Sequence, residues 1–280
     1  MHANPKQSLK DLGQLADNDI PLLETAFLLA ELQHEGISLD RYRQHVITMA
    51  EQVGTRFKNL IEAGADDDAL TRLAALKHII HDQHGYMGDN ETYDDIQNAD
   101  IIRVIDRRKG LPISLAILTL AVGRANGWQM DGINFPGHFL VRITHNNQII
   151  LCDPFTQFRV MLAHDLRELI KKIMGADAEL SSTFYDVAPA RLILLRLQNN
   201  IKARQIDVED FEEALNTVLS MKLFAPNDYR ILFDEAVLRA KLGEAKAAIG
   251  LLEIYITRAE RQADIHDANL LLQSLREALN

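Results

Sequence analysis

The stretch "FPGHFLVRITHNNQIILCDPF", residues 135–155, has a histidine at the start of one apolar run and an aspartate at the end of the next. The alternation within each run predicts two antiparallel strands joined by a tight turn. A carboxylate that bonds one imidazole nitrogen fixes the tautomer and orients the other nitrogen, as in hydrolases and acyl transferases that activate a nucleophile. His138 and Asp153 are therefore candidate catalytic residues.

The position of the turn decides how these two residues are paired. A loop at His145 and Asn146 sets His138 directly opposite Asp153, with Cβ atoms about 5 Å apart. A loop at Asn146 and Asn147 makes them diagonal neighbours on the same sheet face, and only a slip by one residue separates them. The alternative interpretation is a histidine that is buried at a strand start and satisfied by its neighbour.

A histidine–aspartate pair needs a nucleophile, and a helix N-terminus favours one because it lowers a thiol pKa and stabilises an oxyanion. Residues 110–127, "GLPISLAILTLAVGRANG", are apolar almost all round and predict a buried helix that begins near Pro112. Proline cannot attack a carbonyl. Ser114 lies roughly 200° round the helix from Pro112, so its hydroxyl should not face the same histidine. Cys152 should point to the opposite sheet face from Asp153, as a buried structural thiol.

Three segments carry a family resemblance, "RRKGLPISLAILTLA", "GINFPGHFLVR" and "CDPF". They resemble the bacterial SirB-like family, in which a transglutaminase-like domain is joined to tetratricopeptide repeats. In transglutaminase-like and papain-like hydrolases a cysteine opens the buried helix, an alanine follows one turn later, and an arginine and a glycine come near the helix end. Here Ala116, Arg124 and Gly127 match those landmarks, but Pro112 occupies the cysteine position, as is normal for the SirB-like family. The resemblance covers most of the chain and implies its fold and architecture.

Hydrophobic periodicity supplies the elements that must position these residues. A period of 3.6 predicts helices over 17–33, 39–64, 66–85, a short one over 99–110 that ends in basic residues and glycine, and another over 162–175. A period of 2 predicts an antiparallel meander of strands at 128–135, 138–144 and 148–153. The fold class is therefore α+β, a helical N-terminal part with a small antiparallel sheet of transglutaminase-like, papain-like type.

The C-terminal third of the chain contains a repeat. Two segments, which begin at Glu212 and Lys246, align in a way that places Ala214 over Ala248 and Val218 over Leu252. Helix pairs that recur about every 34 residues, with small residues where helices approach closely, indicate tetratricopeptide-like repeats. We therefore expect a transglutaminase-like domain over 1–188 and an α-helical repeat region over 189–280. Because about two repeats bury too little apolar surface to stand alone, we expect them to dock on the preceding domain.

Two polar segments raise the question of a metal site. His78, His81 and His84 are evenly spaced on one predicted helix and wind round it, which favours solvated or capping roles over zinc. The acidic stretch "MGDNETYDD" lacks the alternating ligands and closing glutamate of a calcium loop. We expect no metal and no cofactor.

Composition narrows the class of protein further. The net charge is −10, from 40 acidic and 30 basic residues, which disfavours a nucleic-acid partner. No apolar run approaches the roughly 18–20 residues of a membrane span, and the first residues lack the apolar core of a signal peptide. We expect a cytoplasmic protein with no membrane partner.

These observations favour a non-catalytic module, a pseudoenzyme core joined to repeats, that binds a protein or peptide partner or has a regulatory role. The alternative is a hydrolase or acyl transferase that uses His138 and Asp153 with an unrecognised nucleophile or a bound water. Loss of the nucleophile from a catalytic triad lowers the rate on the order of a millionfold. His138 and Asp153 alone therefore do not restore acyl transfer.

Overall fold

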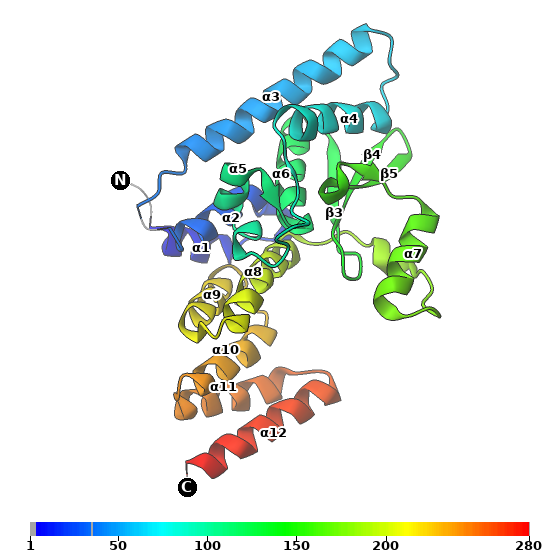
Figure 1. Cartoon of the computed structure of the whole chain (residues 1–280). Helices are drawn as coiled ribbons and strands as arrows, with labels where there is room; N and C mark the ends of the chain where they lie inside the picture. The colour runs from blue at the N-terminus through cyan, green and yellow to red at the C-terminus, as the bar shows by residue number, and fades with distance from the viewer. Residues whose placement is uncertain (1–3, 35, 280) are drawn as a thin grey trace. The chain divides into compact units, whose positions relative to one another are not determined.

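The computed structural model describes residues 4–34 and 36–279, and its contacts divide the chain into two compact units (Figure 1). One unit spans Asp17–Leu197. The other combines residues 4–16 with residues 198–279. The helix α8 (Ala190–Asp207) begins in the first unit and ends in the second.

α6 is the central, buried helix of the first unit. The helices of this unit are α2 (Leu22–Glu31), α3 (Asp40–Glu62), α4 (Ala69–Leu76), α5 (Ile101–Arg107), α6 (Pro112–Ala125) and α7 (Ala163–Met174). Side-chain caps begin two of them: Asp68 accepts from the Thr71 N–H before α4, and Asp100 accepts from the Ile102 N–H before α5. α6 is buried on almost every side, as its sequence predicts, with α2, α3 and α5 packed against it.

A four-stranded antiparallel sheet lies against α6, with strand order β3–β4–β5–β6. The strands are β3 (Gln129–Ile133), β4 (Leu140–His145), β5 (Gln148–Asp153) and β6 (Arg159–Val160). Gly123 of α6 permits the close approach, because a Cβ there would lie 2.0 Å from the sulfur of Met130. α7 covers the other sheet face, where Leu166 and Ile170 pack with Ile133 and Leu140. The predicted three-strand meander is confirmed, and β6 is an addition to it.

Short elements complete this unit. β1 (Met87–Gly88) pairs in parallel with β2 (Lys109–Gly110), a contact that local periodicity does not predict. The helix predicted over 66–85 continues past α4 as a π-helix, η2 (Lys77–Gln83). The prediction that a glycine ends the helix over 99–110 is wrong: Arg108 takes the left-handed position, with φ 60°, and Gly110 lies in β2. Single-turn 3₁₀ helices are η1 (Asp17–Asp19), η3 (Ile96–Asn98), η4 (Pro154–Thr156) and η5 (Ser182–Tyr185).

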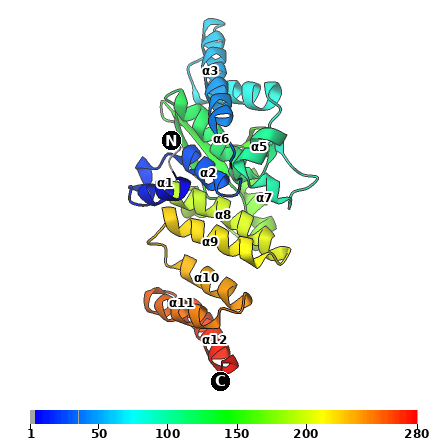
Figure 2. The ribbon, with the colours of Figure 1, turned by 90° about the vertical axis from the view of Figure 1, so that its left-hand side faces the viewer.

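The second unit is entirely helical among the residues described, and Figure 2 shows its helices stacked in succession. They are α1 (Pro5–Leu12), the end of α8, α9 (Phe211–Phe224), α10 (Arg230–Lys241), α11 (Ala245–Arg258) and α12 (Gln262–Ala278). α9 and α11 have the same length and are offset by the same shift at both ends, as the repeat predicts. The aligned residues Ala214, Ala248, Val218 and Leu252 are all fully buried.

α1 is a helix that the sequence analysis did not predict. Asn4 caps it by accepting from the Lys6 N–H, and Leu9 is fully buried. α1 packs against α9, and at Gly13 a Cβ would lie 2.3 Å from the carbonyl oxygen of Leu223. Residues 4–16 therefore belong to the same unit as the repeats. Across the described part of the chain, no helix is both long and apolar enough to cross a membrane.

Candidate functional site

His138 and Asp153 are neighbours. Nε2 of His138 lies 2.9 Å from Oδ2 of Asp153, and the two side chains are 18% and 2% exposed. The turn uses Asn146 and Asn147, both left-handed with φ 46° and 65°. Val141 pairs with Cys152, so the second of the two predicted registers is present and the histidine and aspartate are diagonal neighbours.

Asp153 also holds the backbone that follows it. Its Oδ1 accepts from the Phe155 N–H at 2.9 Å, and its Oδ2 accepts from the Thr156 hydroxyl at 2.8 Å. The carboxylate thus caps η4 as well as contacting His138. Sequence reasoning missed Thr156, although an aspartate followed by threonine three positions later is a recognisable local hydrogen-bonding pattern.

An aromatic residue shields His138 on one side. The Phe155 ring lies edge-on to the imidazole, with ring centroids 6.5 Å apart. Tyr93, from the polar loop before α5, packs on Phe155 at 5.8 Å. Gly88 of β1 lies against the same ring, because a Cβ there would come within 2.5 Å of it. The predicted loop therefore contributes to the surroundings of the site.

Pro112 is the first residue of α6, and α6 packs against both β4 and η4. The order of helix, histidine strand and aspartate strand is thus present in space as well as in sequence. Ser114, the nearest hydroxyl on α6, is fully buried and donates toward the carbonyls of Asn98, at 2.7 Å, and Leu111, at 3.0 Å. Its hydroxyl is therefore engaged with backbone.

Cys152 lies on the sheet face opposite to Asp153, as strand alternation predicts. Its strand partners are Val141 and Val160, and its thiol is fully buried. Burial raises the pKa of this thiol far above its usual value, and the adjacent Asp153 charge raises it further. Cys152 therefore stays protonated and unreactive at neutral pH.

The three histidines of the third predicted helix have separate partners. Nδ1 of His81 lies 2.9 Å from the Tyr86 carbonyl oxygen, and Nε2 of His84 lies 2.6 Å from Oε1 of Gln52. His78 lies 3.7 Å from Asp82. Among the residues described, no group of three or more His, Cys, Asp or Glu side chains is placed to hold a metal ion.

A second polar cluster joins α3, β1 and the end of α5. Arg108 donates to Nε2 of His45 at 2.6 Å and also bonds the Tyr86 hydroxyl. Burial, with the charge of Arg108 and the nearby His84, lowers the pKa of His45 to about 4. Burial likewise raises the pKa of Tyr86 well above its usual value. This cluster was not predicted, because its members are far apart in sequence.

Comparisons with known proteins agree with this fold. The family model "Transglutaminase-like superfamily" matches residues 40–199, and a model "Tetratricopeptide repeat" matches residues 201–273. The chain is 28% identical over 249 residues to a UPF0162 protein of Xylella fastidiosa, covering 88% of this chain and 86% of that one. It is 27% identical to a UPF0162 protein of Vibrio cholerae, covering 68% and 70%.

A eukaryotic protein is also similar over part of its length. The chain is 25% identical over 178 residues to F-box only protein 21 of Mus musculus, covering 61% of this chain and 28% of that protein. The matched families, the element order around α6 and the bacterial relatives agree with the resemblance found in the sequence. The chain belongs to the transglutaminase-like superfamily, carries tetratricopeptide repeats after its transglutaminase-like domain, and is similar to the UPF0162 proteins of bacteria, the SirB-like family.

Proposed function

We propose that this protein is a pseudoenzyme, a non-catalytic transglutaminase-like domain whose repeats bind a protein partner. The observation that carries the proposal is Pro112, which begins α6 where the hydrolases of this superfamily have their cysteine. The two nearest substitutes are unsuitable. The hydroxyl of Ser114 is engaged with backbone carbonyls, and Cys152 is a buried, protonated thiol.

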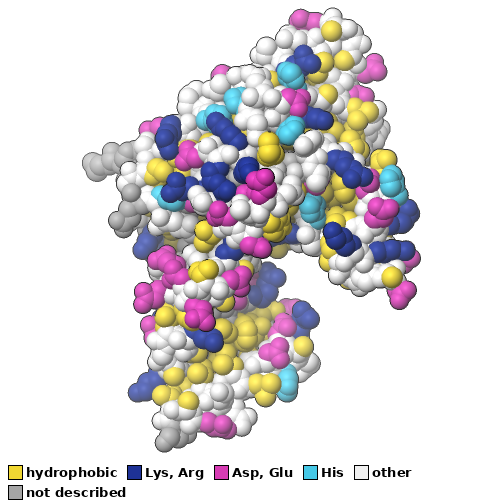
Figure 3. All heavy atoms as spheres, in the orientation of Figure 1, with side chains coloured by type: hydrophobic (Ala, Val, Ile, Leu, Met, Phe, Trp, Pro, Cys, Tyr) yellow, Lys and Arg dark blue, Asp and Glu magenta, His cyan; other side chains and the backbone are white. Residues whose placement is uncertain are grey.

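The repeat unit supports the binding half of the proposal. Hydrophobic side chains gather on its visible face over α10 and α11 (Figure 3). The same region of the chain holds an aromatic group, in which the half-buried Tyr229 and Phe233 pack on the buried Tyr255 at 5.7 Å and 5.2 Å between ring centroids. Aromatic residues contribute strongly to protein interfaces because they bury much area at a low entropy cost.

An activity screen tests the first half. Purified wild-type protein is assayed against a broad set of esters and glutamine amides, with and without a thiol alkylator. We expect no turnover above the uncatalysed rate. Thiol-dependent turnover that disappears in Cys152→Ser would contradict the pseudoenzyme proposal.

Affinity purification with mass spectrometry tests the second half. We expect a partner that is recovered equally by the wild type and by His138→Ala, and that is lost with Phe233→Ala. A partner whose recovery depends on His138 and not on Phe233 would place binding at the transglutaminase-like domain and contradict the role of the repeats.

The His138–Asp153 contact favours a second candidate, a hydrolase or acyl transferase. Asp153 faces Nε2, so Nδ1 is the nitrogen left to act as a base. The nucleophile would then be a bound water or a residue not yet recognised. Turnover that survives Cys152→Ser and alkylation but disappears in His138→Ala would establish this candidate in place of the first.

A further inference from the structure

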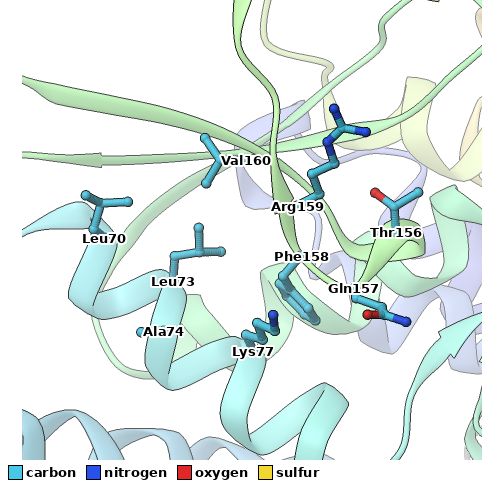
Figure 4. Close-up of a pocket in the computed structure, with 9 residues that line it drawn as sticks. All are labelled: Leu70, Leu73, Ala74, Lys77, Thr156, Gln157, Phe158, Arg159 and Val160. Carbon is cyan, nitrogen blue, oxygen red and sulfur yellow. The ribbon is translucent and has the colours of Figure 1, made fainter. Parts of the chain in front are cut away.

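A groove of about 520 Å³ lies in the first unit between α4 and the β5–β6 hairpin (Figure 4). Pro112, His138 and Asp153 do not line it, and Thr156, whose hydroxyl bonds Asp153, is a lining residue that it shares with the surroundings of the candidate catalytic site. Figure 4 shows one wall formed by α4 and the start of η2, and the other by the hairpin. The lining residues are Leu70, Leu73, Ala74 and Lys77 on the helix side and residues 156–160 on the other.

The groove has an apolar floor and a basic rim. Leu73 and Phe158 are almost fully buried at its base, while Leu70 is 54% exposed at its edge. Both charged residues that line it, Lys77 and Arg159, are basic, although the whole chain has a net charge of −10. Complementary charge would attract an acidic group to this rim.

The two basic side chains differ in whether they are already paired with an acidic group of the protein. Arg159 donates through Nη2 to Asp165, which partly offsets its charge. Lys77 is exposed and makes no hydrogen bond or ion pair with any residue that the structure describes. Lys77 is therefore the cation that a ligand carboxylate can pair with.

The hairpin wall also offers backbone groups. β6 is the edge strand of the sheet. Asp153 pairs with Arg159 and the Met161 N–H bonds the Leu151 carbonyl, so both residues flanking Val160 turn their backbone groups toward β5. In an antiparallel ladder the residue between them turns its N–H and C=O the other way. Val160, itself a lining residue, therefore presents a donor and an acceptor at the open edge.

The turn that leads into β6 has an energetically unfavourable backbone conformation. Gln157 and Phe158 are both left-handed, with φ 57° and 61°, and neither is glycine or asparagine. A bulky residue in this region is energetically unfavourable. The turn places the Phe158 ring at the base of the groove and Val160 at its edge (Figure 4).

We propose that this groove binds an extended peptide segment of a partner protein that carries a large apolar side chain close to an Asp or Glu. The segment pairs with Val160 as an added strand, in the manner of β-augmentation. Its apolar side chain lies over Leu73 and Phe158, and its carboxylate pairs with Lys77. The proposal concerns a site other than the repeats and does not depend on whether the protein is catalytic.

Peptide display tests this proposal. A phage-displayed library of random dodecapeptides is panned against the immobilised full-length chain, and individual clones are then measured against variants. Lys77→Glu reverses the charge at the rim. Val160→Pro removes the outward N–H and exchanges the valine side chain for a similarly sized ring, and an edge strand tolerates it because no ladder hydrogen bond is lost. Lys58→Glu, at an exposed position on α3 that does not line the groove, is the matched charge control. Thermal melting confirms that each variant is folded.

We expect clones with an acidic residue close to a large apolar one. Their affinity should fall about tenfold or more in Lys77→Glu and in Val160→Pro and stay unchanged in Lys58→Glu. Clones that bind all four proteins equally, or no specific clones, would overturn the proposal. A groove that selects no peptide but binds the fatty-acid anion decanoate in a Lys77-dependent way would also overturn it, in favour of a small amphiphile.

Discussion

At the scale of single residues, Asp153 has two roles that the sequence does not separate. It contacts His138, and it accepts hydrogen bonds from the Phe155 N–H and the Thr156 hydroxyl. A buried carboxylate with these partners holds η4 in place whether or not any chemistry occurs. The presence of an aspartate here is therefore not by itself a sign of catalysis.

Replacing Asp153 should cost more stability than replacing His138. In Asp153→Ala the buried N–H of Phe155 loses its acceptor, and the free energy of unfolding should fall by about 2–4 kcal/mol. His138→Ala removes a partly exposed ring and should cost about 1 kcal/mol. Urea denaturation measures both, and equal losses would show that Asp153 serves mainly to orient His138.

The single thiol gives a second prediction at this scale. Cys152 is fully buried and its pKa is raised by burial, so a thiol-specific reagent such as Ellman's should not label the native protein. Raising the pH to about 9 should not accelerate labelling beyond the rate of unfolding, whereas urea should expose the thiol completely. Rapid labelling of folded protein at neutral pH would contradict the buried position.

At the scale of elements, the junction of α3, β1 and α5 should make stability depend on pH. The pKa of His45 is lowered to about 4, so its neutral form is favoured in the folded state and the unfolded chain binds the proton more readily. Its contribution is fully present above about pH 6.5 and is lost as the pH falls toward about 4. Because the ring is only partly buried, the loss should be on the order of 1 kcal/mol.

Unfolding at a series of pH values measures this slope. His45→Gln should flatten it, because glutamine does not titrate. His84, whose pKa is also lowered by burial and by Arg108, should keep part of the slope in the variant. A slope that is identical in wild type and His45→Gln would show that other groups cause the acid sensitivity.

The elements that the sequence predicted well carry strong local signals. α6 was predicted from its all-round apolar pattern and Pro112, and α9 and α11 from the repeat that relates them. β6 could not be predicted, because it is very short and follows left-handed Gln157 and Phe158, neither of which is a usual left-handed residue. Two registers were left open, because a loop at His145 and Asn146 and a loop at Asn146 and Asn147 both contain asparagine, which tolerates the left-handed conformation.

The candidate site likewise has one contact that the sequence predicts and others that it does not. The adjacency of His138 and Asp153 was predictable because a hairpin is local. Phe155 against Tyr93, and Arg108 against His45, bring together residues from distant segments. Such contacts depend on tertiary packing, which periodicity in one sequence does not contain.

At the scale of the whole molecule, the repeat unit is discontinuous in sequence. α1 packs on α9, and the fully buried Leu9 lies on α1. The division at residue 188, and the docking of the repeats on the preceding domain, remain predictions. A fragment that begins at 189 lacks α1 and should melt at a lower temperature than the same region in the full chain.

A single substitution tests the contribution of α1. Leu9→Ala should lower the free energy of unfolding by about 2–4 kcal/mol, because it leaves a cavity where a fully buried leucine stood. Leu15→Ala, at a 40% exposed position in the same segment, is the matched control and should cost well under about 1 kcal/mol. Similar melting temperatures for the two variants would contradict a structural role for α1.

The place of α1 also sets an order of events during synthesis. Leu12 ends α1 close to the start of the chain, whereas Phe211 begins α9 only after the whole first unit has been translated. At about 5–20 residues per second the ribosome needs roughly 10–40 s to cover that interval. Throughout that interval the apolar side of α1 is exposed to water, because α9, on which it packs, has not yet been made. α1 thus emerges before every helix of the first unit and is among the last to pack, and a factor that shelters nascent chains has a long time in which to bind it.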